Sequence, residues 1–574
     1  MTAVEVEDLV KRFRGPRGIL SALAGVSFRL DEGSFTALVG PDGAGKTTLM
    51  RLLAGLLRPD SGRIILFGQE LGRDAGQLRD RLGYMPQRFG LYERLSVREN
   101  LELYAELYGL SGAQRRRRIA EILEITGLSP FPDRLAGRLS GGMKQKLALG
   151  AVLLRPRGLL LLDEPSVGVD PLSRRELFAL ARAHGARGTT VLWSTAYLDE
   201  AERCDRVLAL DGGELFADAE PAELARSLAG GVHLVDVPER ERGAWLERLA
   251  ADRDVFDVRI RGGRLRIVHR PGRLPAAIEP LRAEPAAPGL EDVIAARLRE
   301  RQDADPPQSA PGPASVRTSR RNRDEVVIRV RDLVRDFGTF RAVDHLSFEV
   351  RRGEVFGLLG PNGAGKSTTF RMLCGVLPPS AGEARVLGHD LLSAAALARA
   401  RIGYMAQKFS LYGELTVRAN LEFTADVYGL AGRRRKARFE AVVEELELAP
   451  FLEARAETLP LGFRQRLQMA AALIHEPEIL FLDEPTSGVD LLARRAFWRH
   501  ILQLAAGGTS VLVTTHFLDE AEYCDRVLIM DRGRMLELGP PAEIVSRTRR
   551  LEPSIDNLED AFIALLRDRG RAAA

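Results

Sequence analysis

The sequence has few of the features that mark secreted, membrane-spanning or nucleic-acid-binding proteins. It contains three cysteines, Cys204, Cys374 and Cys524, among 574 residues. A small, odd and widely spaced set argues against a disulfide framework and favours a reducing cytosol. The N-terminal segment MTAVEVEDLVKRF has no apolar signal region, and no run of about 18 apolar residues occurs, so we expect no membrane span. The net charge of +4 is mild and gives no reason to expect a nucleic-acid partner.

What the sequence does contain is one long segment that occurs twice. The chain is too long for a single hydrophobic core, so several domains are expected from length alone. Matching residues of the two copies lie 320 positions apart: Lys46 and Lys366, Gln87 and Gln407, Asp163 and Asp483, Asp170 and Asp490. A constant offset of this kind indicates two copies of one domain.

The segments outside the copies have patterns of their own. VFDVRIRGGRLRIVH, from Val255 to His269, alternates apolar and charged residues around two glycines, which predicts a β-hairpin in a small α/β appendage. A following stretch rich in Pro, Ser and Arg, without periodicity, predicts a flexible linker. The predicted segments are the first copy (1–230), the appendage (231–300), the linker (301–324), the second copy (325–545) and a C-terminal helical tail (546–574).

Each copy has a glycine loop between an apolar run and a helical pattern: FTALVGPDGAGKTTLMRLL and VFGLLGPNGAGKSTTFRML. Both fit G-x-x-x-x-G-K-[ST], whose backbone N–H groups and helix N-terminus bind phosphates. The lysines reach the terminal phosphates, and Thr47 and Ser367 can bind Mg²⁺. The candidate nucleotide-binding residues are Gly40, Pro41, Asp42, Gly43, Ala44, Gly45, Lys46, Thr47 and Thr48, and Gly360, Pro361, Asn362, Gly363, Ala364, Gly365, Lys366, Ser367 and Thr368.

Further along each copy, an apolar run ends in two acids: LLLLDEPSVGVD and ILFLDEPTSGVD. Adjacent carboxylates at the end of a buried strand are costly without a cation, so Asp163 and Asp483 are candidate Mg²⁺ ligands. Glu164 and Glu484 are candidate general bases that orient the attacking water.

The segment LSGGMKQKL at Leu139, taken with these motifs in this order, resembles the signature of ATP-binding-cassette (ABC) ATPases over residues 4–230 and 326–545. The resemblance implies an α/β fold: two P-loop NTPase cassettes, each a RecA-like core with antiparallel β and helical subdomains. It implies ATP and Mg²⁺ as cofactors. It also implies that Gln87 and Gln407 sense Mg²⁺, that Phe13 and Phe337 stack on adenine, and that Ser140, Gly141 and Gly142 contact nucleotide.

The segment YMPQRFGLYERLSVRENL, together with LEDVI at Leu290 and LEDAF at Leu558, resembles one branch of the family, the tandem-cassette ATP-binding subunits of bacterial drug exporters. This implies separate type-2 transmembrane permease subunits as partners and a peripheral location on the cytoplasmic face of the inner membrane. The resemblance also implies that the cassettes pair head to tail, within one chain or between two. The alternatives are a soluble tandem ABC ATPase acting on the ribosome and a tandem sugar-importer ATPase.

The two copies differ where the family places reacting groups. VLWSTAYLDEAERCD has Ala196 where VLVTTHFLDEAEYCD has His516, which in the family contacts the γ-phosphate. The second signature reads LPLGF, with Pro460 and Leu461 in place of Ser140 and Gly141. In a head-to-tail pair both losses affect the pocket of Lys46, where Asp42 also adds a carboxylate. We therefore predict one consensus site, with Glu484 and His516, and one degenerate site, where Glu164 remains a candidate base.

Overall fold

The fold is described from a computed structural model of residues 1–574. The described residues are 1–15, 18–72, 76–87, 89–155, 157–238, 241–279, 281–304, 324–487, 489, 491–515 and 517–572. Most of the predicted linker therefore lies outside the described residues. Contacts divide the chain into two units, Met1–Val232 with Ala286–Leu298, and His233–Pro285 with Arg299–Ala574.

In the first unit, an antiparallel sheet forms from strands with one buried face. Val26, Phe28 and Leu30 are buried, and the residues between them are exposed, which is the alternation expected of a half-buried strand. In the order β2-β1-β4-β5, the described strands are β2 (Gly18–Asp31), β1 (Thr2–Gly15), β4 (Ser61–Leu66) and β5 (Gln69–Glu70).

The central sheet of this unit is mainly parallel, with its last strand antiparallel at one edge. Strands β3, β7 and β8 are buried at every position, as expected for parallel strands covered on both faces. In the order β10-β9-β3-β8-β7-β6, the described strands are β10 (Glu214–Ala219), β9 (Arg206–Asp211), β3 (Phe35–Val39), β8 (Thr190–Ser194), β7 (Leu159–Asp163) and β6 (Leu82–Met85).

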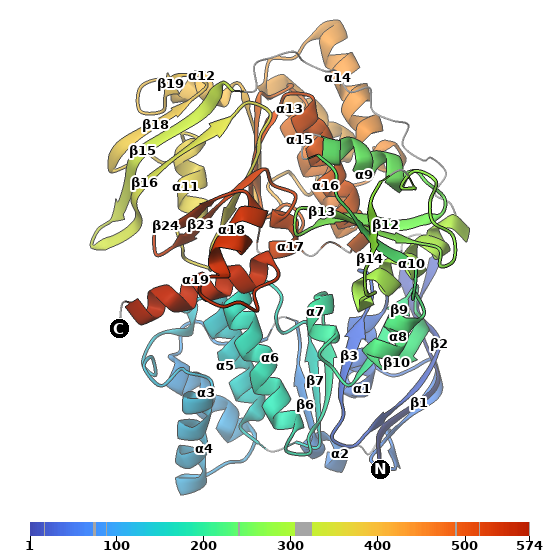
Figure 1. Ribbon diagram of the computed structural model, residues 1–574. Coiled ribbons are helices and arrows are strands. Elements are labelled where there is room, and N and C mark those ends of the chain that lie inside the picture. The colour runs from blue at the N-terminus through green and yellow to red at the C-terminus, as the bar shows by residue number, and fades with distance from the viewer. Residues whose placement is uncertain are drawn as a thin grey trace. The chain divides into compact units, whose positions relative to one another are not determined.

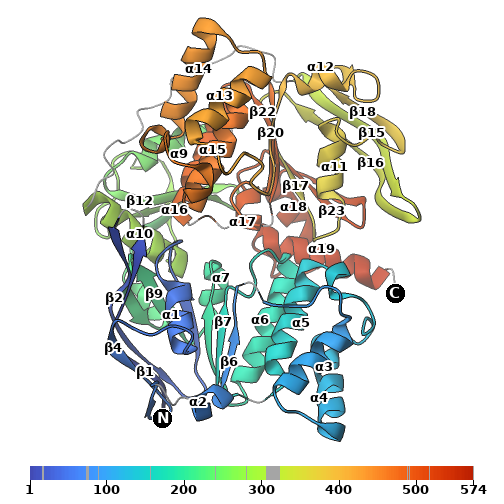
Figure 2. The same cartoon turned by 180° about the vertical axis from the view of Figure 1, so that it is seen from behind.

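The helices of the first unit fall into two groups. Helices α3 (Val97–Leu107), α4 (Gly112–Ile125) and α5 (Gly141–Leu153) lie together, away from β1 and β2 (Figures 1 and 2). Helix α3 begins at a capping box, in which Ser96 and Glu99 each bond to the other's backbone N–H. The other described helices are α1 (Lys46–Leu53), α2 (Gly76–Arg81), α6 (Pro171–Gly185), α7 (Leu198–Ala201), α8 (Pro221–Arg226) and α10 (Leu290–Ala304).

The second unit repeats this design. Its antiparallel sheet has the order β16-β15-β18-β19, with β16 (Phe340–Arg351), β15 (Val326–Phe337), β18 (Ala381–Val386) and β19 (His389–Asp390). Its mainly parallel sheet has the order β20-β21-β22-β17-β23-β24, with β20 (Ile402–Met405), β21 (Ile479–Asp483), β22 (Ser510–Thr514), β17 (Val355–Leu359), β23 (Arg526–Asp531) and β24 (Arg534–Gly539).

The helices of the second unit complete the correspondence. They are α11 (Lys366–Leu373), α12 (Ala395–Arg399), α13 (Val417–Val427), α14 (Gly432–Glu445), α15 (Leu461–Leu473), α16 (Leu491–Ala506), α17 (Leu518–Ala521), α18 (Pro541–Thr548) and α19 (Leu558–Ala572). Two α/β cassettes with mixed sheets and helical parts confirm the predicted fold class. No helix in the described part of the chain is both long and apolar enough to cross a bilayer.

Residues 233–285 contribute a further sheet to the second unit, in the order β12-β13-β11-β14. The predicted hairpin is present as β12 (Val255–Arg261) and β13 (Arg264–His269), turning at two glycines of positive φ. Strands β11 (Val232–Val235) and β14 (Ala283–Pro285) extend the sheet, and α9 (Arg242–Ala250) packs against α16 (Figure 1). The segment that we predicted as one appendage, 231–300, is thus divided between the units, since the chain rejoins the first at Ala286.

Candidate functional site

The loop between β3 and α1 needs its glycines. Gly40 and Gly45 have φ of 152° and 105°. A Cβ at Gly40 would lie 2.1 Å from the Leu210 carbonyl oxygen, and one at Gly45 would lie 2.4 Å from that of Ala22. The loop therefore keeps a bare backbone at the N-terminus of α1, which is the arrangement that binds phosphate oxygens.

The lysines of both loops are buried and turned onto the loop backbone. Lys46 Nζ donates to the carbonyl of Gly40 at 2.7 Å, and Lys366 Nζ donates to that of Gly360 at 2.7 Å. A Cβ at Gly360 would lie 2.5 Å from the Met530 carbonyl oxygen, so the second loop has the same steric requirement. Both predicted phosphate loops are thus built alike.

The first acid of each pair lies at the end of its strand, beside a hydroxyl group. Asp163 is fully buried, Thr47 Oγ1 donates to its Oδ1 at 3.3 Å, and its Oδ2 has no hydrogen-bond partner among the described residues. Burial raises the pKa of Asp163. In the second unit Thr514 Oγ1 donates to Asp483 Oδ1 at 2.7 Å, and burial raises the pKa of Asp483. A buried carboxylate beside a hydroxyl oxygen suits Mg²⁺, so these residues fit the predicted ion.

The second acid of each pair is held by the predicted glutamine. Gln87 Nε2 donates to Glu164 Oε2 at 2.7 Å, and Gln407 Nε2 donates to Glu484 Oε2 at 2.7 Å. Glu164 and Glu484 have φ of 50° and 49°, in the left-handed region that non-glycine residues rarely adopt. Strained backbone that recurs at the same place in both copies is typical of a functional turn.

The two signature segments differ in local structure. Ser140 caps α5 by accepting the N–H of Met143 at 3.3 Å, and a Cβ at Gly142 would lie 2.6 Å from the Ser173 side chain. Gly141 is the first residue of this helix. In the second unit Pro460 stands at the N-cap of α15 with no side-chain cap, and the Leu461 side chain is exposed. Only the first segment presents a hydroxyl group beside two glycines.

The predicted adenine-stacking rings are exposed at strand ends. Phe13 is 39% exposed and Phe337 is 47% exposed, so neither belongs to a hydrophobic core. Lys11 Nζ lies 5.6 Å from the Phe13 ring centroid, and the Arg335 guanidinium lies 4.7 Å from that of Phe337. Their role in stacking stays a prediction.

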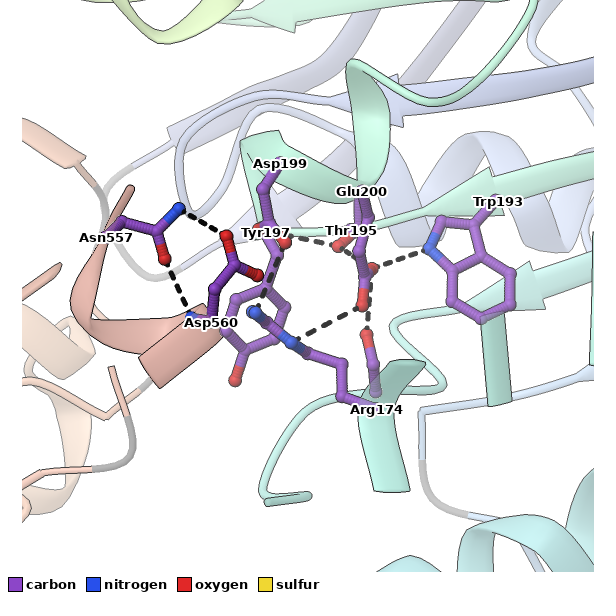
Figure 3. A network of polar contacts seen from close by, with 9 residues as sticks. Arg174, Trp193, Thr195, Tyr197, Asp199, Glu200, Asn557 and Asp560 are labelled. Atoms are coloured by element: carbon purple, nitrogen blue, oxygen red, sulfur yellow. Dashed lines mark hydrogen bonds and ion pairs between the residues drawn. The ribbon is translucent and has the colours of Figure 1, made fainter. Parts of the chain in front are cut away.

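The segments after β8 and β22 contain the Ala196 and His516 positions and a buried glutamate that the sequence patterns did not single out. His516 and Asp490 lie outside the described residues; Ala196 is described and exposed. Glu200, four residues after Ala196, is buried and accepts hydrogen bonds from Trp193 Nε1 at 2.8 Å and Thr195 Oγ1 at 2.7 Å (Figure 3). Burial raises its pKa to about 7. LDEAE occurs in both copies, at Leu198 and Leu518, but the repeat alone does not indicate that its first glutamate is buried.

Comparisons with known proteins agree with this geometry. The family profile "ABC transporter" matches residues 23–167 and 343–487, one stretch in each copy. The "Probable multidrug ABC transporter ATP-binding protein YbhF" of Escherichia coli (strain K12) is 46% identical over 571 residues, which are 98% of this chain and 98% of that protein. The "Daunorubicin resistance ATP-binding protein DrrA3" of Streptomyces coeruleorubidus is 41% identical over 225 residues, 39% of this chain and 71% of that protein.

Among solved structures, "Structure of ATP binding subunit of ABC transporter" is 30% identical, covers 42% of this chain and 99% of its own, and has a TM-score of 0.39. The family match spans both copies, and each copy has the phosphate loop, the acid pair and the glutamine in place. The chain therefore belongs to the ABC transporter family, as an ATP-hydrolysing subunit that carries two ATP-binding cassettes.

Proposed function

We propose that this protein supplies ATP-driven motion to separate type-2 permease subunits that export drugs or other small molecules. The relatives whose names refer to multidrug transport and daunorubicin resistance support this proposal. On this proposal the protein is peripheral, on the cytoplasmic face of the inner membrane.

An exposed apolar surface on the helical part of each cassette supports a membrane-protein partner. Tyr412, Phe423 and Val427 are exposed on and beside α13, and the Tyr412 and Phe423 rings meet edge to face at 5.2 Å. Tyr92 and Leu107 are exposed on and beside α3 in the first cassette. Exposed apolar groups that gather on one element are typical of interaction surfaces, and these lie on the elements that follow the Gln87 and Gln407 loops.

We propose that the two ATP sites are unequal. The consensus site would combine the second phosphate loop, Glu484 and His516 with the first signature, Ser140-Gly141-Gly142. The degenerate site would combine the Lys46 loop with the second signature. The observation that carries this proposal is that both losses, Ala196 and the Pro460-Leu461 pair, affect the same site when cassettes pair head to tail. The pairing would occur within one chain or between two.

The chemistry at the consensus site follows from the residues in place. The loop N–H groups and Lys366 would hold the phosphates, and Ser367 with Asp483 would hold Mg²⁺, which offsets phosphate charge when bound. Glu484, fixed by Gln407, would orient and deprotonate the attacking water. Each lost contact to transition-state charge slows hydrolysis by about 10²–10³-fold, so two losses leave the degenerate site to bind ATP without appreciable turnover.

Paired substitutions test this asymmetry. Glu484→Gln should lower kcat by at least about 100-fold, whereas Glu164→Gln should leave it within about 3-fold, with ATP binding retained in both. Equal losses in the two variants would refute the unequal sites.

The transport assignment has a test of its own. Purification from membranes in mild detergent should bring down hydrophobic partner chains. Sedimentation with ribosomes would instead support the ribosomal alternative.

A further inference from the structure

The two cassettes share a buried carboxylate, at matching positions, that the proposed chemistry does not use. Glu520 is 2% exposed and lies in α17, the short helix after β22. Glu200 is 3% exposed and lies in α7, the short helix after β8. A buried carboxylate is costly unless hydrogen bonds and charge compensate it, so its partners indicate its role.

The partners of Glu520 come from three different elements. Thr486 Oγ1, in the turn after β21, donates to Glu520 Oε1 at 2.6 Å. Thr515 Oγ1, just after β22, donates to Glu520 Oε2 at 2.6 Å. Arg494 Nε, in the first turns of α16, lies 3.7 Å from Oε1. The two carboxylate oxygens therefore link the turn after β21 to the residue that follows β22.

Both loops lead directly to the reacting acids. Thr486 follows Glu484 by two residues, in a turn closed by the Ser487 N–H donating to the Glu484 carbonyl at 3.3 Å. Thr515 follows Thr514, whose Oγ1 accepts the Glu484 N–H at 2.9 Å. The Glu484 backbone, with its φ of 49°, is thus fixed on one side by Thr514 and on the other by the turn that Glu520 holds.

We propose that Glu520 is a positioning residue for ATP hydrolysis in the second cassette. Its carboxylate holds the turn after Glu484 against the end of β22, and so fixes where the Glu484 carboxylate points. The inference rests on the proposed function in one respect, the role of Glu484 as the base. A glutamine at 520 keeps one acceptor oxygen, loses the negative charge that faces Arg494, and forces one threonine to change from donor to acceptor, so the link between the two loops is weakened.

The first cassette provides a matched control. Ser166 Oγ donates to Glu200 Oε2 at 3.0 Å, Thr195 Oγ1 donates to the same atom, and Arg174 Nε lies 3.9 Å from Oε1. Trp193 adds a donor that the second cassette lacks, because Val513 stands at the matching place (Figure 3). Glu200→Gln is therefore the same chemical change at the same place, in the cassette that contributes no reacting acid to the consensus site.

The test compares steady-state ATPase activity and thermal unfolding of the full-length protein with its membrane partners. Glu520→Gln should lower kcat by about 10- to 100-fold with KM for ATP within about 3-fold, because misplacing a reacting group affects the chemical step rather than binding. Glu200→Gln should leave kcat within about 3-fold. A kcat loss without a KM change separates positioning from general loss of structure.

The threonines keep the inference testable if Glu520→Gln fails to fold. Thr486→Val should copy the kcat loss, and Thr486→Ser should keep wild-type activity, because serine retains the hydroxyl group. Combining Thr486→Val with Glu520→Gln should cost little more than either change alone, since each change weakens the same link between the two loops.

The outcomes separate this inference from the proposed function. Wild-type kcat in Glu520→Gln, in a protein that Glu484→Gln inactivates, would overturn the positioning role and leave the unequal sites intact. If Glu484→Gln is inactive and Glu164→Gln is active, equal kcat losses in Glu520→Gln and Glu200→Gln would also overturn the positioning role. Equal kcat losses for Glu484→Gln and Glu164→Gln would reject the unequal sites. The positioning role of Glu520 would then be decided by the kcat of Glu520→Gln relative to the wild-type protein.

Discussion

Asp257, on the hairpin strand β12, should be necessary for the stability of the second unit. Its buried side chain lies between two guanidinium groups, that of the buried Arg259 and that of the partly buried Arg495: Arg259 Nη1 donates to Oδ2 at 2.8 Å, and Arg495 Nε on α16 lies 3.7 Å from Oδ1. Arg495 also donates to the Tyr523 hydroxyl at 3.0 Å, and Tyr523 stacks on Trp498 at 5.3 Å. The carboxylate therefore joins residues 233–285 to the body of the second cassette.

Asp257→Ala removes a buried carboxylate that faces both arginines. Breaking a buried ion pair by removing one partner costs about 3–5 kcal/mol. Local stability of that size corresponds to a loss of at least about 100-fold in hydrogen-exchange protection of the β12–β13 amides. Exchange followed by mass spectrometry on the full chain measures it, with one peptide set covering the hairpin and another covering α16.

A matched control lies in the same segment. Asp236 pairs with Arg264 at 3.1 Å but is 72% exposed, so Asp236→Ala should cost less than about 1 kcal/mol. If Asp257→Ala and Asp236→Ala changed protection equally, the buried contact would not be what attaches this segment to the cassette.

Two further predictions concern pH and the phosphate loop. Gly262 N–H donates to the buried carboxylate of Glu522, and burial raises the pKa of Glu522 to about 7 from 4.5. The folded state therefore holds its proton more tightly, so the free energy of unfolding should fall as pH rises from about 5 to 8, by up to about 3 kcal/mol, and Glu522→Gln should remove this part of the pH dependence in denaturant titrations. Gly360→Ala places a Cβ 2.5 Å from a carbonyl oxygen and should abolish ATP-induced thermal stabilisation of the second cassette, whereas Gly462→Ala, with nothing within 4 Å, should preserve it.

The sequence was sufficient for features that depend on short spacing. The glycine loops, the acid pairs at strand ends and the hairpin around Gly262 and Gly263 are all encoded within about 20 residues, so pattern and residue chemistry define them. The fold class followed from the resemblance of these motifs, in their order along each copy, to those of ABC ATPases.

Features that depend on long-range contacts were not predictable. Glu200 and Glu520 stand in acidic helix starts, which as a pattern indicate exposed positions, and only the fold brings Ser166 or Thr486 to them across 34 residues. The left-handed φ of Glu484 also has no local signal, because strain at a non-glycine residue is imposed by its surroundings. The return of the chain to the first unit at Ala286 is likewise a property of tertiary packing.

Trapping of the hydrolysis product would test the unequal sites most directly. The full-length protein, together with the permease subunits proposed above, would turn over a photoreactive, α-labelled ATP analogue in the presence of vanadate. A protease site engineered between residues 305 and 323 would then separate the two halves. The account predicts trapped, labelled ADP on the half that contains Lys366 and only unhydrolysed nucleotide on the half that contains Lys46. Equal amounts of trapped ADP on both halves would contradict it.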